Sequence, residues 1–373
     1  MYITNLCLND FRNYKTLELQ FGQNLNIIYG NNAQGKTNIL EAIFICAFGK
    51  SYRTNRDNEI IRFGEQKYKI SLEYKKRDIR TKIEISYTKN EKKKLKINEI
   101  PEKKLSSLVG RFNAVIFSPE DLLVIKEGPS NRRRYIDMAL SQLKPSYLYT
   151  LQQYSKVIYQ RNLVLKNMQE NKKFSNTLDI WDLNIAELGS KIMLYRNEYI
   201  KKLNTFAKES HLKMTERSEN LNIRYSPSIK ITEMDDFNKL KNDFYNTLEK
   251  NRDKDLIMSA TSYGPHKDDY IIEINDKNVK LYGSQGQQRS AVLSLKLAEI
   301  EIIKEIQEDY PVLLLDDVMS ELDKTRQEFL LKDAGKIQTF ITCTDRDIFS
   351  SNIHNNINYY YVTNGCVDTS VNL

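Results

Sequence analysis

Apolar and polar positions alternate in different ways along the chain, and the first stretch predicts strands around one helix. Residues 1–30 contain three runs typical of strands, the last being the apolar "LNIIY" that ends before Gly30. A helical pattern follows from Lys36 to about Phe48. Residues 68–100 alternate apolar and basic positions, which predicts antiparallel hairpins with one face in solvent.

Helical spacing dominates the middle of the chain. From about Glu120 to Lys254, Gly and Pro are scarce and apolar residues recur at helical intervals, as in "LYTLQQYSKVIYQRNLVL". Strand character returns at "DYIIEIND", and residues 281–345 alternate helix, strand and turn. We therefore expect an α/β protein in which a mostly helical second lobe is inserted into the first. The expected segments are residues 1–118 and 301–373 for the first lobe and residues 119–300 for the second.

Size and composition are those of an ordinary soluble protein with more than one core. The chain has 373 residues, of which 40% are hydrophobic and 28% charged. Its apolar runs are too short to cross a bilayer, and its first residues do not resemble an export signal. The four cysteines have no paired spacing, so we expect reduced, buried thiols. These features predict a cytoplasmic protein with no membrane partner.

The net charge of +8 is compatible with a polyanionic partner such as nucleic acid. The chain is also rich in Lys, Asn and Ile together, a composition that mutational bias produces without any role in binding. Charge therefore favours a nucleic-acid partner but does not decide the question.

The segment "GNNAQGKT" matches the phosphate-loop pattern G-x-x-x-x-G-K-[ST] between an apolar strand and an apolar helix. Its glycines let successive N–H groups converge on phosphate oxygens, and the helix adds its positive N-terminal end. Lys36 would reach the β- and γ-phosphates, and the Thr37 hydroxyl would bind Mg²⁺. The sequence thus predicts a nucleoside triphosphate and Mg²⁺ as cofactors. The predicted contacts are Gly30, Asn31, Asn32, Ala33, Gln34, Gly35, Lys36 and Thr37.

The segment "PVLLLDDVMSELD", residues 311–323, places two carboxylates directly after a short apolar strand. In a phosphate-loop ATPase the first of them, here Asp316, holds Mg²⁺ through water. The next, Asp317, is placed to polarise the attacking water, so Asp316, Asp317 and Lys36 are the predicted catalytic residues. The alternative is a strand-end pair of carboxylates that caps a turn, and the phosphate loop in the same chain makes this alternative less favoured.

The order of these motifs resembles one class of nucleotide-binding protein. About 280 residues separate the phosphate loop from the acidic strand, and the turn "GSQGQQR" lies just before that strand. This order is similar to the ABC-type ATPase heads of the SMC superfamily, in which a signature loop and its helix precede the acidic strand. The resemblance implies the corresponding P-loop head fold with an inserted helical lobe. It makes "SELD", residues 320–323, the D-loop and places Thr344 where many relatives have a switch histidine.

Six segments resemble the RecF family of bacterial recombination mediators more closely, and they follow that family's order along nearly the whole chain. Two of them, "SPEDL" and "GSQGQQR", are specific to that family. The segments are "GNNAQGKTNILEAI" (30–43), "GKSYRTNRDNEIIRFG" (49–64), "VIFSPEDLLVIKEGPSNRRRYID" (115–137), "GPHKDD" (264–269), "GSQGQQRSAVLSLKLAE" (283–299) and "LLLDDVMSELD" (313–323).

The resemblance implies that ATP is sandwiched between two protomers. Ser284, Gly286 and Gln287 would then contact the nucleotide bound by the phosphate loop of the other subunit. The chemistry suits this role, because a glycine permits close approach, a serine donates a hydrogen bond, and a helix start attracts an anion. Gln285 replaces the first glycine of the general ABC signature, a departure that the RecF family shares.

Asp317 is a second departure from most ABC ATPases, which have Glu at this position. Aspartate is one methylene shorter and should hold the attacking water less closely, so we expect slow hydrolysis. Thr344 stands where many relatives have the switch histidine, and this difference also predicts slow hydrolysis. Both features suit a switch in which ATP stabilises a DNA-bound dimer and hydrolysis releases it.

Four arginines are candidate DNA contacts. Arg53 and Arg56 follow the phosphate-loop helix, where a solvated basic loop is an equally good interpretation. Arg132 and Arg133 lie in "NRRR" at an apparent helix start, where their charge opposes the helix dipole. An anionic partner or acidic neighbours would be needed to offset it, so DNA and pairing between lobes both remain open.

The RecF resemblance implies a role in recombinational gap repair with RecR and RecO, acting on the recombinase indirectly. It implies binding to duplex DNA and to junctions of single- and double-stranded DNA through backbone contacts, with affinity that falls steeply with salt. The alternatives are the motor subunit of an ABC transporter and a nuclease-linked ATPase, for which Asp268 and Asp269 are the acidic pair to check.

His266 has no metal-like spacing to the other histidines or to a cysteine pair, so zinc is not expected.

Overall fold

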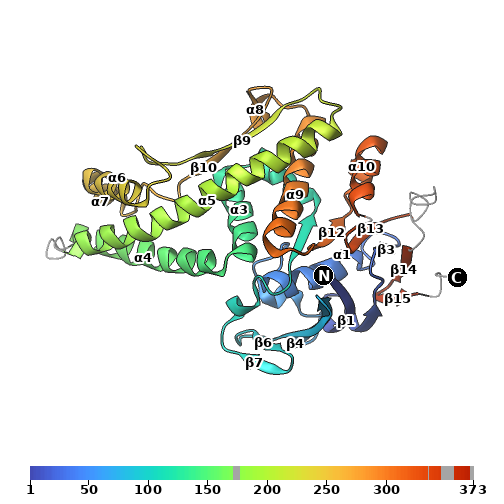
Figure 1. The fold of residues 1–373 in the computed structure, drawn as a ribbon. Coiled ribbons are helices and arrows are strands. Elements are labelled where there is room, and N and C mark those ends of the chain that lie inside the picture. Colours follow the sequence, from blue (N-terminus) through green and yellow to red (C-terminus); the bar gives the residue numbers. More distant parts are fainter. Residues whose placement is uncertain (171–176, 335, 346–356, 370–373) are drawn as a thin grey trace. The chain divides into compact units, whose positions relative to one another are not determined.

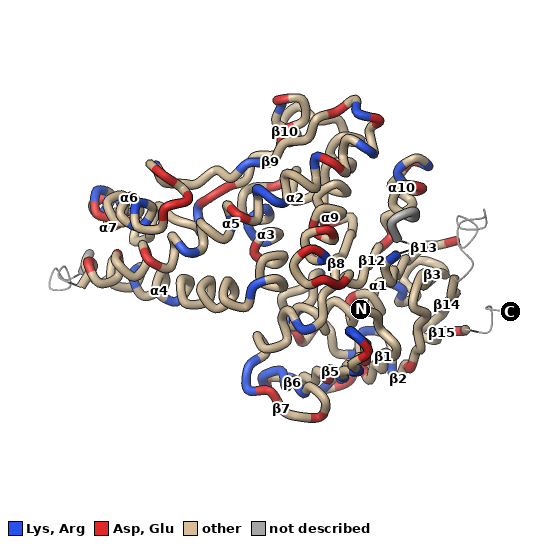
Figure 2. Tube along the Cα trace, in the orientation of Figure 1, with Lys and Arg blue, Asp and Glu red and all other residues tan. Residues whose placement is uncertain are grey.

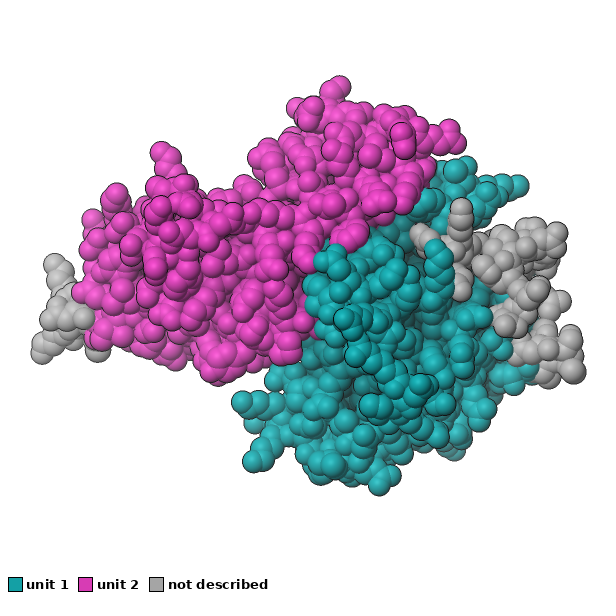
Figure 3. Space-filling model, viewed as in Figure 1, with its two compact units in different colours: residues 1–121, 295–373 teal, residues 122–294 magenta. Residues whose placement is uncertain are grey.

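The structure is a computed structural model that describes residues 1–170, 177–334, 336–345 and 357–369. It divides into two compact units (Figure 3). Unit 1 comprises Met1–Asp121 and Leu295–Leu373, and unit 2 comprises Leu122–Ser294. The chain passes between the units twice, and the second passage lies inside one long helix, α9 (Gln285–Gln307).

The first sheet of unit 1 brings the phosphate loop and the acidic strand to one edge. Its strand order is β15-β14-β3-β13-β12-β8, and every pairing is parallel except that of β15 with β14. Because β13 lies between β3 and β12, the carboxyl ends of all three strands meet at the same edge. The strands are β3 (Leu25–Tyr29), β8 (Ala114–Phe117), β12 (Val312–Asp316), β13 (Thr339–Cys343), β14 (Ile357–Thr363) and β15 (Cys366–Asp368).

The second sheet of unit 1 is antiparallel, with the order β2-β1-β4-β5-β6-β7. Its last four strands confirm the hairpins predicted over residues 68–100. Apolar residues such as Ile70, Leu72, Ile83 and Ile85 are buried on one face, while lysines lie on the other. The strands are β1 (Tyr2–Phe11), β2 (Tyr14–Gln20), β4 (Lys67–Lys76), β5 (Ile79–Thr88), β6 (Lys94–Ile97) and β7 (Ile100–Glu102).

Helix α1 (Lys36–Phe48) confirms the helix predicted after the phosphate loop. It packs against β4 and β5 of the antiparallel sheet and against β8, β12 and β13 of the parallel sheet (Figure 1). Ten of its residues are buried, because a helix between two sheets is apolar on all sides. Short elements complete the unit: η1 (Asp57–Ile60), η2 (Leu105–Leu108), η3 (Pro119–Leu122), η5 (Met319–Glu321) and α10 (Lys324–Ala334).

Unit 2 is mostly helical, as its spacing predicts, with the long helices α4 (Pro145–Glu170) and α5 (Leu178–Met214) packed along each other (Figure 1). It also contains a small antiparallel sheet of order β11-β10-β9. Strand β9 (Leu221–Ser226) lies within the stretch expected to be helical, and that expectation was wrong for these residues. The other elements are α2 (Leu123–Lys126), α3 (Pro129–Leu143), α6 (Phe237–Lys250), α7 (Arg252–Met258), β10 (Asp269–Ile274), β11 (Lys277–Asn278) and α8 (Val279–Tyr282).

A fully buried arginine ties three segments of unit 2 together. The Arg161 guanidinium on α4 donates to Asp182 on α5 at 2.6 Å and to Asp255 on α7 at 2.7 Å. All three side chains are inaccessible to solvent. Arg252 adds a second cation, with its Nη2 2.7 Å from Asp182. Charges buried without partners are very costly, so each ion of this group depends on the others.

A nearly buried ion pair joins the two places where the chain leaves unit 1. Lys296, on the part of α9 that belongs to this unit, lies 2.8 Å from an Asp121 carboxylate oxygen. Asp121 also accepts a hydrogen bond from the Ser118 backbone N–H at 2.7 Å. The "SPEDL" segment thus contains the carboxylate that holds the end of the first segment of unit 1 next to the start of its second segment.

The cysteines depart from the expectation of buried thiols at two positions, Cys7 and Cys366. All four are free, and Cys46 and Cys343 are buried as expected, while Cys7 is half-buried. Cys366 is exposed because it begins β15, the outermost strand of its sheet. In the part of the chain that the structure describes, no helix combines the length and apolar character needed to span a membrane.

Candidate nucleotide-binding site

The phosphate loop lies between β3 and α1 and has a backbone that requires glycine at two points. Gly30 has φ 146°, and a Cβ there would lie 2.3 Å from the Val362 carbonyl oxygen. Gly35 has φ 119° and lies against the side chains of Asn13 and Tyr14. Any larger residue would be strained and would collide with β14 or with the turn between β1 and β2. The close packing of neighbouring elements therefore fixes the loop.

Lys36 and Thr37 open α1 and face the loop and the acidic strand. The buried Lys36 ammonium donates to the carbonyl oxygens of Gly30 at 2.7 Å and Asn31 at 3.0 Å. The Thr37 hydroxyl donates to Asp316 Oδ1 at 2.8 Å, across 279 residues of sequence. The predicted phosphate-binding lysine, the predicted metal-binding hydroxyl and the predicted metal-binding carboxylate therefore lie together.

Two asparagines that sequence reasoning missed brace the loop at Gln34. Asn13 donates to the Gln34 carbonyl oxygen at 2.7 Å and accepts from Asn38 of α1 at 2.8 Å. From the other side, the Asn364 backbone N–H donates to Gln34 Oε1 at 2.6 Å. The loop is thus held between the β1–β2 turn and the β14–β15 turn. No local motif marks these contacts, because they depend on how distant strands pair.

The Asp316 carboxylate, at the end of β12, is almost buried and accepts three hydroxyl hydrogen bonds. Oδ1 accepts from Thr37 and, at 2.9 Å, from Thr342, which is opposite Asp316 in the β12–β13 register. Oδ2 accepts from Tyr52 at 2.7 Å. Burial and the neighbouring Asp316 charge raise the pKa of the Tyr52 phenol far above its usual value, so the phenol is a neutral donor. Thr342 and Tyr52 were not predicted from the sequence.

Asp317 follows with a left-handed backbone, φ 53°, and its N–H donates to the Thr342 hydroxyl at 2.8 Å. Aspartate and asparagine tolerate this conformation better than longer side chains. The backbone therefore gives a physical reason for Asp rather than Glu at this position. Burial, and next the Asp316 charge, raise the pKa of the Asp317 carboxyl above its ordinary value.

The donor set suits Mg²⁺ bound with a nucleotide. A threonine hydroxyl and a carboxylate are hard oxygen ligands, and Mg²⁺ in phosphate-loop sites uses one or two such protein groups together with phosphates and water. The described residues contain no group of three or more His, Cys, Asp or Glu side chains suited to holding a metal ion. The protein groups at this site therefore fit a metal that arrives with phosphates.

The signature turn lies in unit 2, at the start of α9. The Ser284 N–H donates to Gln287 Oε1 at 2.9 Å, and the Gln287 N–H donates to Ser284 Oγ at 3.2 Å. This reciprocal pair is a capping box that satisfies the first turn of the helix. The bond uses the serine oxygen as an acceptor, and the Ser284 hydroxyl donates no hydrogen bond to another of the residues that the structure describes. Around Gly286 a Cβ would meet only Ser284 Oγ, at 3.8 Å, so packing within the described chain does not require glycine there.

The predicted D-loop follows Asp317 closely. The Ser320 hydroxyl donates to the Asp317 carbonyl oxygen at 2.9 Å, and Asp323 accepts from the Arg326 backbone N–H at 2.9 Å at the start of α10. Thr344 is exposed directly after β13. The segment from Asp317 to Asp323 is therefore an ordered continuation of the acidic strand.

The four candidate DNA-binding arginines differ in what they contact. Arg132 is buried, and its guanidinium donates to Asp269 at 2.7 and 3.0 Å and to two backbone carbonyl oxygens. Arg133 donates to the Asp268 carbonyl oxygen at 2.6 Å. Acidic neighbours therefore offset the charge at the start of α3, and because Asp269 belongs to the same unit as Arg132, this pairing lies within unit 2 and is not a pairing between lobes.

The two arginines of unit 1 also differ. Arg53 Nη1 lies 2.9 Å from Asn38 Oδ1 and 3.4 Å from the buried Glu41 carboxylate, both on α1. Arg56 is 83% exposed and 3.8 Å from Glu59. Figure 2 shows that basic and acidic residues are interspersed along the chain of both units. Exposure therefore favours Arg56 over Arg53 as a contact for a large anionic partner.

The "GPHKDD" segment is held by internal hydrogen bonds. His266 contacts the Tyr154 hydroxyl at 2.8 Å and the Thr261 carbonyl oxygen at 2.9 Å. Asp268 is buried and accepts from the Tyr225 hydroxyl and the Ser228 N–H. Both oxygens of the Asp268 carboxylate are thus engaged with protein donors, an arrangement that explains its conformation without a metal ion.

Replacing His266 with glutamine is expected to flatten the pH dependence of unfolding between pH 7 and pH 5. Burial, opposed by the Thr261 hydrogen bond and aided by Lys267, lowers the pKa of His266 below its ordinary value. A depressed histidine pKa means that stability is lost as the pH falls, because the unfolded chain takes up the proton more readily. Urea midpoints at pH 7, 6 and 5 measure this, and equal slopes in both proteins would contradict it.

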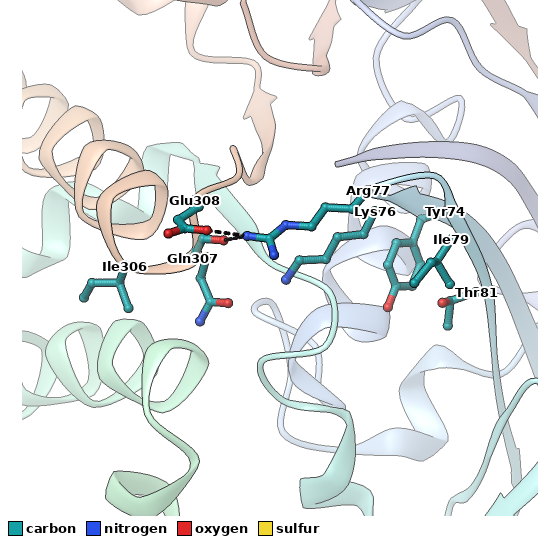
Figure 4. A pocket seen from close by; sticks show the side chains of 8 residues that line it. All are labelled: Tyr74, Lys76, Arg77, Ile79, Thr81, Ile306, Gln307 and Glu308. Carbon is teal, nitrogen blue, oxygen red and sulfur yellow. Dashed lines mark hydrogen bonds and ion pairs between the residues drawn. The ribbon is translucent and has the colours of Figure 1, made fainter.

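A pocket of about 570 Å³ lies elsewhere in unit 1, between the β4–β5 hairpin and the end of α9 (Figure 4). Arg77 donates across it to Glu308 at 2.8 Å and to the Gln307 carbonyl oxygen at 3.3 Å. None of its lining residues belongs to the phosphate loop or the acidic strand. The pocket is therefore separate from the predicted nucleotide contacts.

Sequence comparison gives matches along almost the whole chain. The family model described as the RecF/RecN/SMC N-terminal domain matches residues 2–368. The DNA replication and repair protein RecF of Acetivibrio thermocellus is 53% identical over 351 residues, which cover 94% of this chain and 95% of that protein. The protein of the same name in Ruminiclostridium cellulolyticum is 48% identical over 366 residues, 98% of each chain.

Solved structures agree with the sequence matches. A structure of the recombination mediator protein RecF–ATPrS in the RecFOR pathway superimposes with a TM-score of 0.92 at 38% identity, covering 99% of this chain and 98% of that one. The Smc head domain of Pyrococcus furiosus, with a TM-score of 0.57 at 16% identity over 98% of this chain and 95% of that one, shares the fold. The expected SMC-like ATPase head fold is confirmed.

Proposed function

This chain belongs to the RecF family of DNA replication and repair proteins, and from that membership we propose that it is an ATP-dependent DNA-binding protein of recombinational gap repair. The observation that carries the proposal is the 2.8 Å contact between the Thr37 hydroxyl and the Asp316 carboxylate. It joins the phosphate loop to the acidic strand in one site, as nucleotide binding requires.

Each residue of the site has one task in this proposal. Bound ATP with Mg²⁺ supplies the phosphoanhydride that is cleaved. The N–H groups of the loop and the Lys36 ammonium bind phosphate oxygens, and Thr37 and Asp316 hold the metal ion. Asp317 orients the attacking water. Its short side chain favours slow hydrolysis, which suits a switch better than a motor.

The second half of the site comes from another copy of the chain. Ser284 keeps its hydroxyl hydrogen unused in the capping box, so it can donate to a phosphate oxygen while still capping α9. Gly286 lies in the first turn of α9, and no packing contact of the described residues requires glycine there. Close approach of an external phosphate explains both residues, and the positive end of α9 adds to the attraction.

DNA binding would rest on backbone phosphates. The net charge of +8 supports it, and Arg56 and Arg134 are exposed basic side chains, one in each unit. Duplexes and junctions of single- and double-stranded DNA are the proposed ligands. RecR and RecO are the proposed protein partners, through which the protein acts on the recombinase indirectly; the RecFOR pathway named for the similar solved structure supports this assignment.

Sedimentation with and without ATP and DNA tests the proposal. Wild-type protein is expected to form dimers with ATP. Lys36→Arg should bind ATP weakly and stay monomeric, because arginine cannot fill the same space between the loop carbonyls. Ser284→Arg should bind ATP in its own phosphate loop, which is unchanged. It should stay monomeric, because Ser284 contacts the ATP that is bound by the other subunit. Gly286→Ala should weaken the dimer at least tenfold while leaving the monomer as stable or more stable.

The matched control is Ser218→Arg, which adds the same charge at another exposed serine of unit 2. It should dimerise like the wild type. A wild-type protein that remains monomeric at saturating ATP would rule out the shared site. Dimers of Ser284→Arg equal to those of Ser218→Arg would exclude the signature turn from it.

A further inference from the structure

Tyr52 is a residue of the site for which neither the phosphate-loop pattern nor the acidic strand gives a role. It lies four residues beyond the end of α1, and its hydroxyl donates to Asp316 Oδ2 at 2.7 Å. The other carboxylate oxygen accepts from Thr37 and Thr342. The two oxygens of Asp316 are therefore distinguished, since one faces the threonines and the other faces the phenol.

Contacts with α1 hold the Tyr52 ring and the residue before it in place. It packs edge-on against Phe44 of α1, with centroids 5.1 Å apart, and Phe44 stacks on Phe48 at 4.3 Å. The preceding residue, Ser51, is buried and donates to Glu41 at 2.5 Å, and it accepts from the Arg53 N–H. Because α1 also begins with Lys36 and Thr37, the same helix positions the phenol and the phosphate-binding residues.

A carboxylate attached to a strand end rotates easily about its terminal torsion, for which the energy wells are broad. A hydrogen bond to one oxygen restricts that rotation. In metal sites, groups that hydrogen-bond a ligand in this way orient it, and their loss costs about 10–100-fold in metal affinity. Tyr52 is in the position to do this for Asp316, because it occupies the oxygen that does not face Thr37.

We propose that Tyr52 is a positioning residue that holds the Asp316 carboxylate with Oδ1 directed to the Thr37 side, where the metal ion of the nucleotide site binds. The inference rests on the proposed function, since it requires an ATP-bound Mg²⁺ ion. The affinity for this Mg²⁺ ion would then depend on the Tyr52 phenol, which lies outside the phosphate loop, the acidic strand and the signature turn. Tyr52 contacts neither the nucleotide nor the metal ion in this role.

The test is Tyr52→Phe, which keeps the ring and removes the hydroxyl. Nucleotide binding is measured with a fluorescent ATP analogue, first without Mg²⁺ and then along a Mg²⁺ titration at fixed protein concentration. The Mg²⁺ concentration at half-maximal effect is expected to rise about tenfold. The affinity for the nucleotide without Mg²⁺ is expected to stay as in the wild type, because Lys36 and the loop N–H groups are unchanged.

The matched control is Tyr360→Phe. Tyr360 is buried in the same unit, on β14, and its hydroxyl donates to the Gln20 carbonyl oxygen at 2.9 Å. Both variants should lower the melting temperature by a few degrees, as the loss of one buried hydrogen bond does. Only Tyr52→Phe should move the Mg²⁺ midpoint, a change that a purely structural tyrosine would not produce.

Two failures can be told apart. If the wild type responds to Mg²⁺ and Tyr52→Phe gives the same midpoint, the inference is overturned and the proposed function stands. If the wild type shows no Mg²⁺-dependent nucleotide binding, the proposed function and this inference both fail. A midpoint that shifts equally in Tyr360→Phe would also overturn the inference, because it would show a general effect of lost stability.

Discussion

Asp317→Asn is expected to lower the single-turnover rate of ATP hydrolysis by about 10²–10⁴-fold, the usual contribution of a well-placed general base. An amide cannot take the proton of the attacking water. Asparagine is nevertheless the most conservative replacement, because it matches aspartate in size and tolerates the left-handed backbone at φ 53°. ATP binding should be kept, since Lys36, Thr37 and Asp316 are unchanged. Rapid-quench hydrolysis with enzyme in excess and a separate ATP affinity measure both quantities.

The same variant should also be somewhat more stable than the wild type at pH 7, because a half-buried charge beside Asp316 is removed. Asp317→Glu is the companion variant. A longer carboxylate should hold water more closely and raise the rate, while the left-handed backbone opposes the longer side chain. An Asp317→Asn protein that hydrolyses ATP at the wild-type rate would remove Asp317 from the mechanism. An Asp317→Glu protein that unfolds at the wild-type midpoint, and so accommodates the longer side chain, but shows no gain in rate would contradict the side-chain-length explanation for slow turnover.

Arg161→Met is expected to destabilise unit 2 by about 3–5 kcal/mol, the cost of leaving buried carboxylates without their cation. Asp182 and Asp255 are inaccessible to solvent, and methionine fills the space without neutralising them. Arg252 still contacts Asp182, so the larger share of the cost should come from Asp255. Urea unfolding followed by circular dichroism at pH 7 measures the effect.

The control is Arg224→Met, which removes an exposed arginine of the same unit, paired with Glu273 at 3.2 Å. Surface pairs contribute about 0–1 kcal/mol, so this variant should unfold near the wild-type midpoint. Equal effects of the two substitutions would show that the buried group contributes no more than a surface pair. Full recovery in Arg161→Met combined with Asp255→Leu would identify the unpaired Asp255 as the cause.

The phosphate loop, α1 and the acidic strand were readable in the sequence because their signals are local. Glycines at 30 and 35, an apolar strand before them and an apolar helix after them specify one structure. The two carboxylates after "VLLL" are marked in the same way by the strand that precedes them. The paired Ser284 and Gln287 also follow a local spacing, S-x-x-Q, which indicates a capping box in any helix.

The hydrogen bonds that hold the site together from distant segments could not be predicted from the sequence, because they depend on the order of the strands in the sheets. Thr342 reaches Asp316 because β13 lies between β3 and β12, and Asn13 reaches Gln34 because the β1–β2 turn packs on α1. The strand β9 was missed because a six-residue run is easily absorbed in a helical pattern, although Leu221 and Ile223 alternate as strand residues do. The sequence left the partner of Arg132 open, because that partner, Asp269, is 137 residues away.

The position of β3 in its sheet has a consequence for how the protein is made. β3 carries the phosphate loop, yet its neighbours on both sides are β13 and β14, which begin at Thr339 and Ile357. A ribosome adds about 5–20 residues per second, so roughly 15–60 s pass between the synthesis of β3 and that of its partners. During this interval the nascent chain has a complete phosphate-loop sequence but an unpaired strand. We therefore expect the ability to bind ATP to arise only after β13 and β14 have been synthesised.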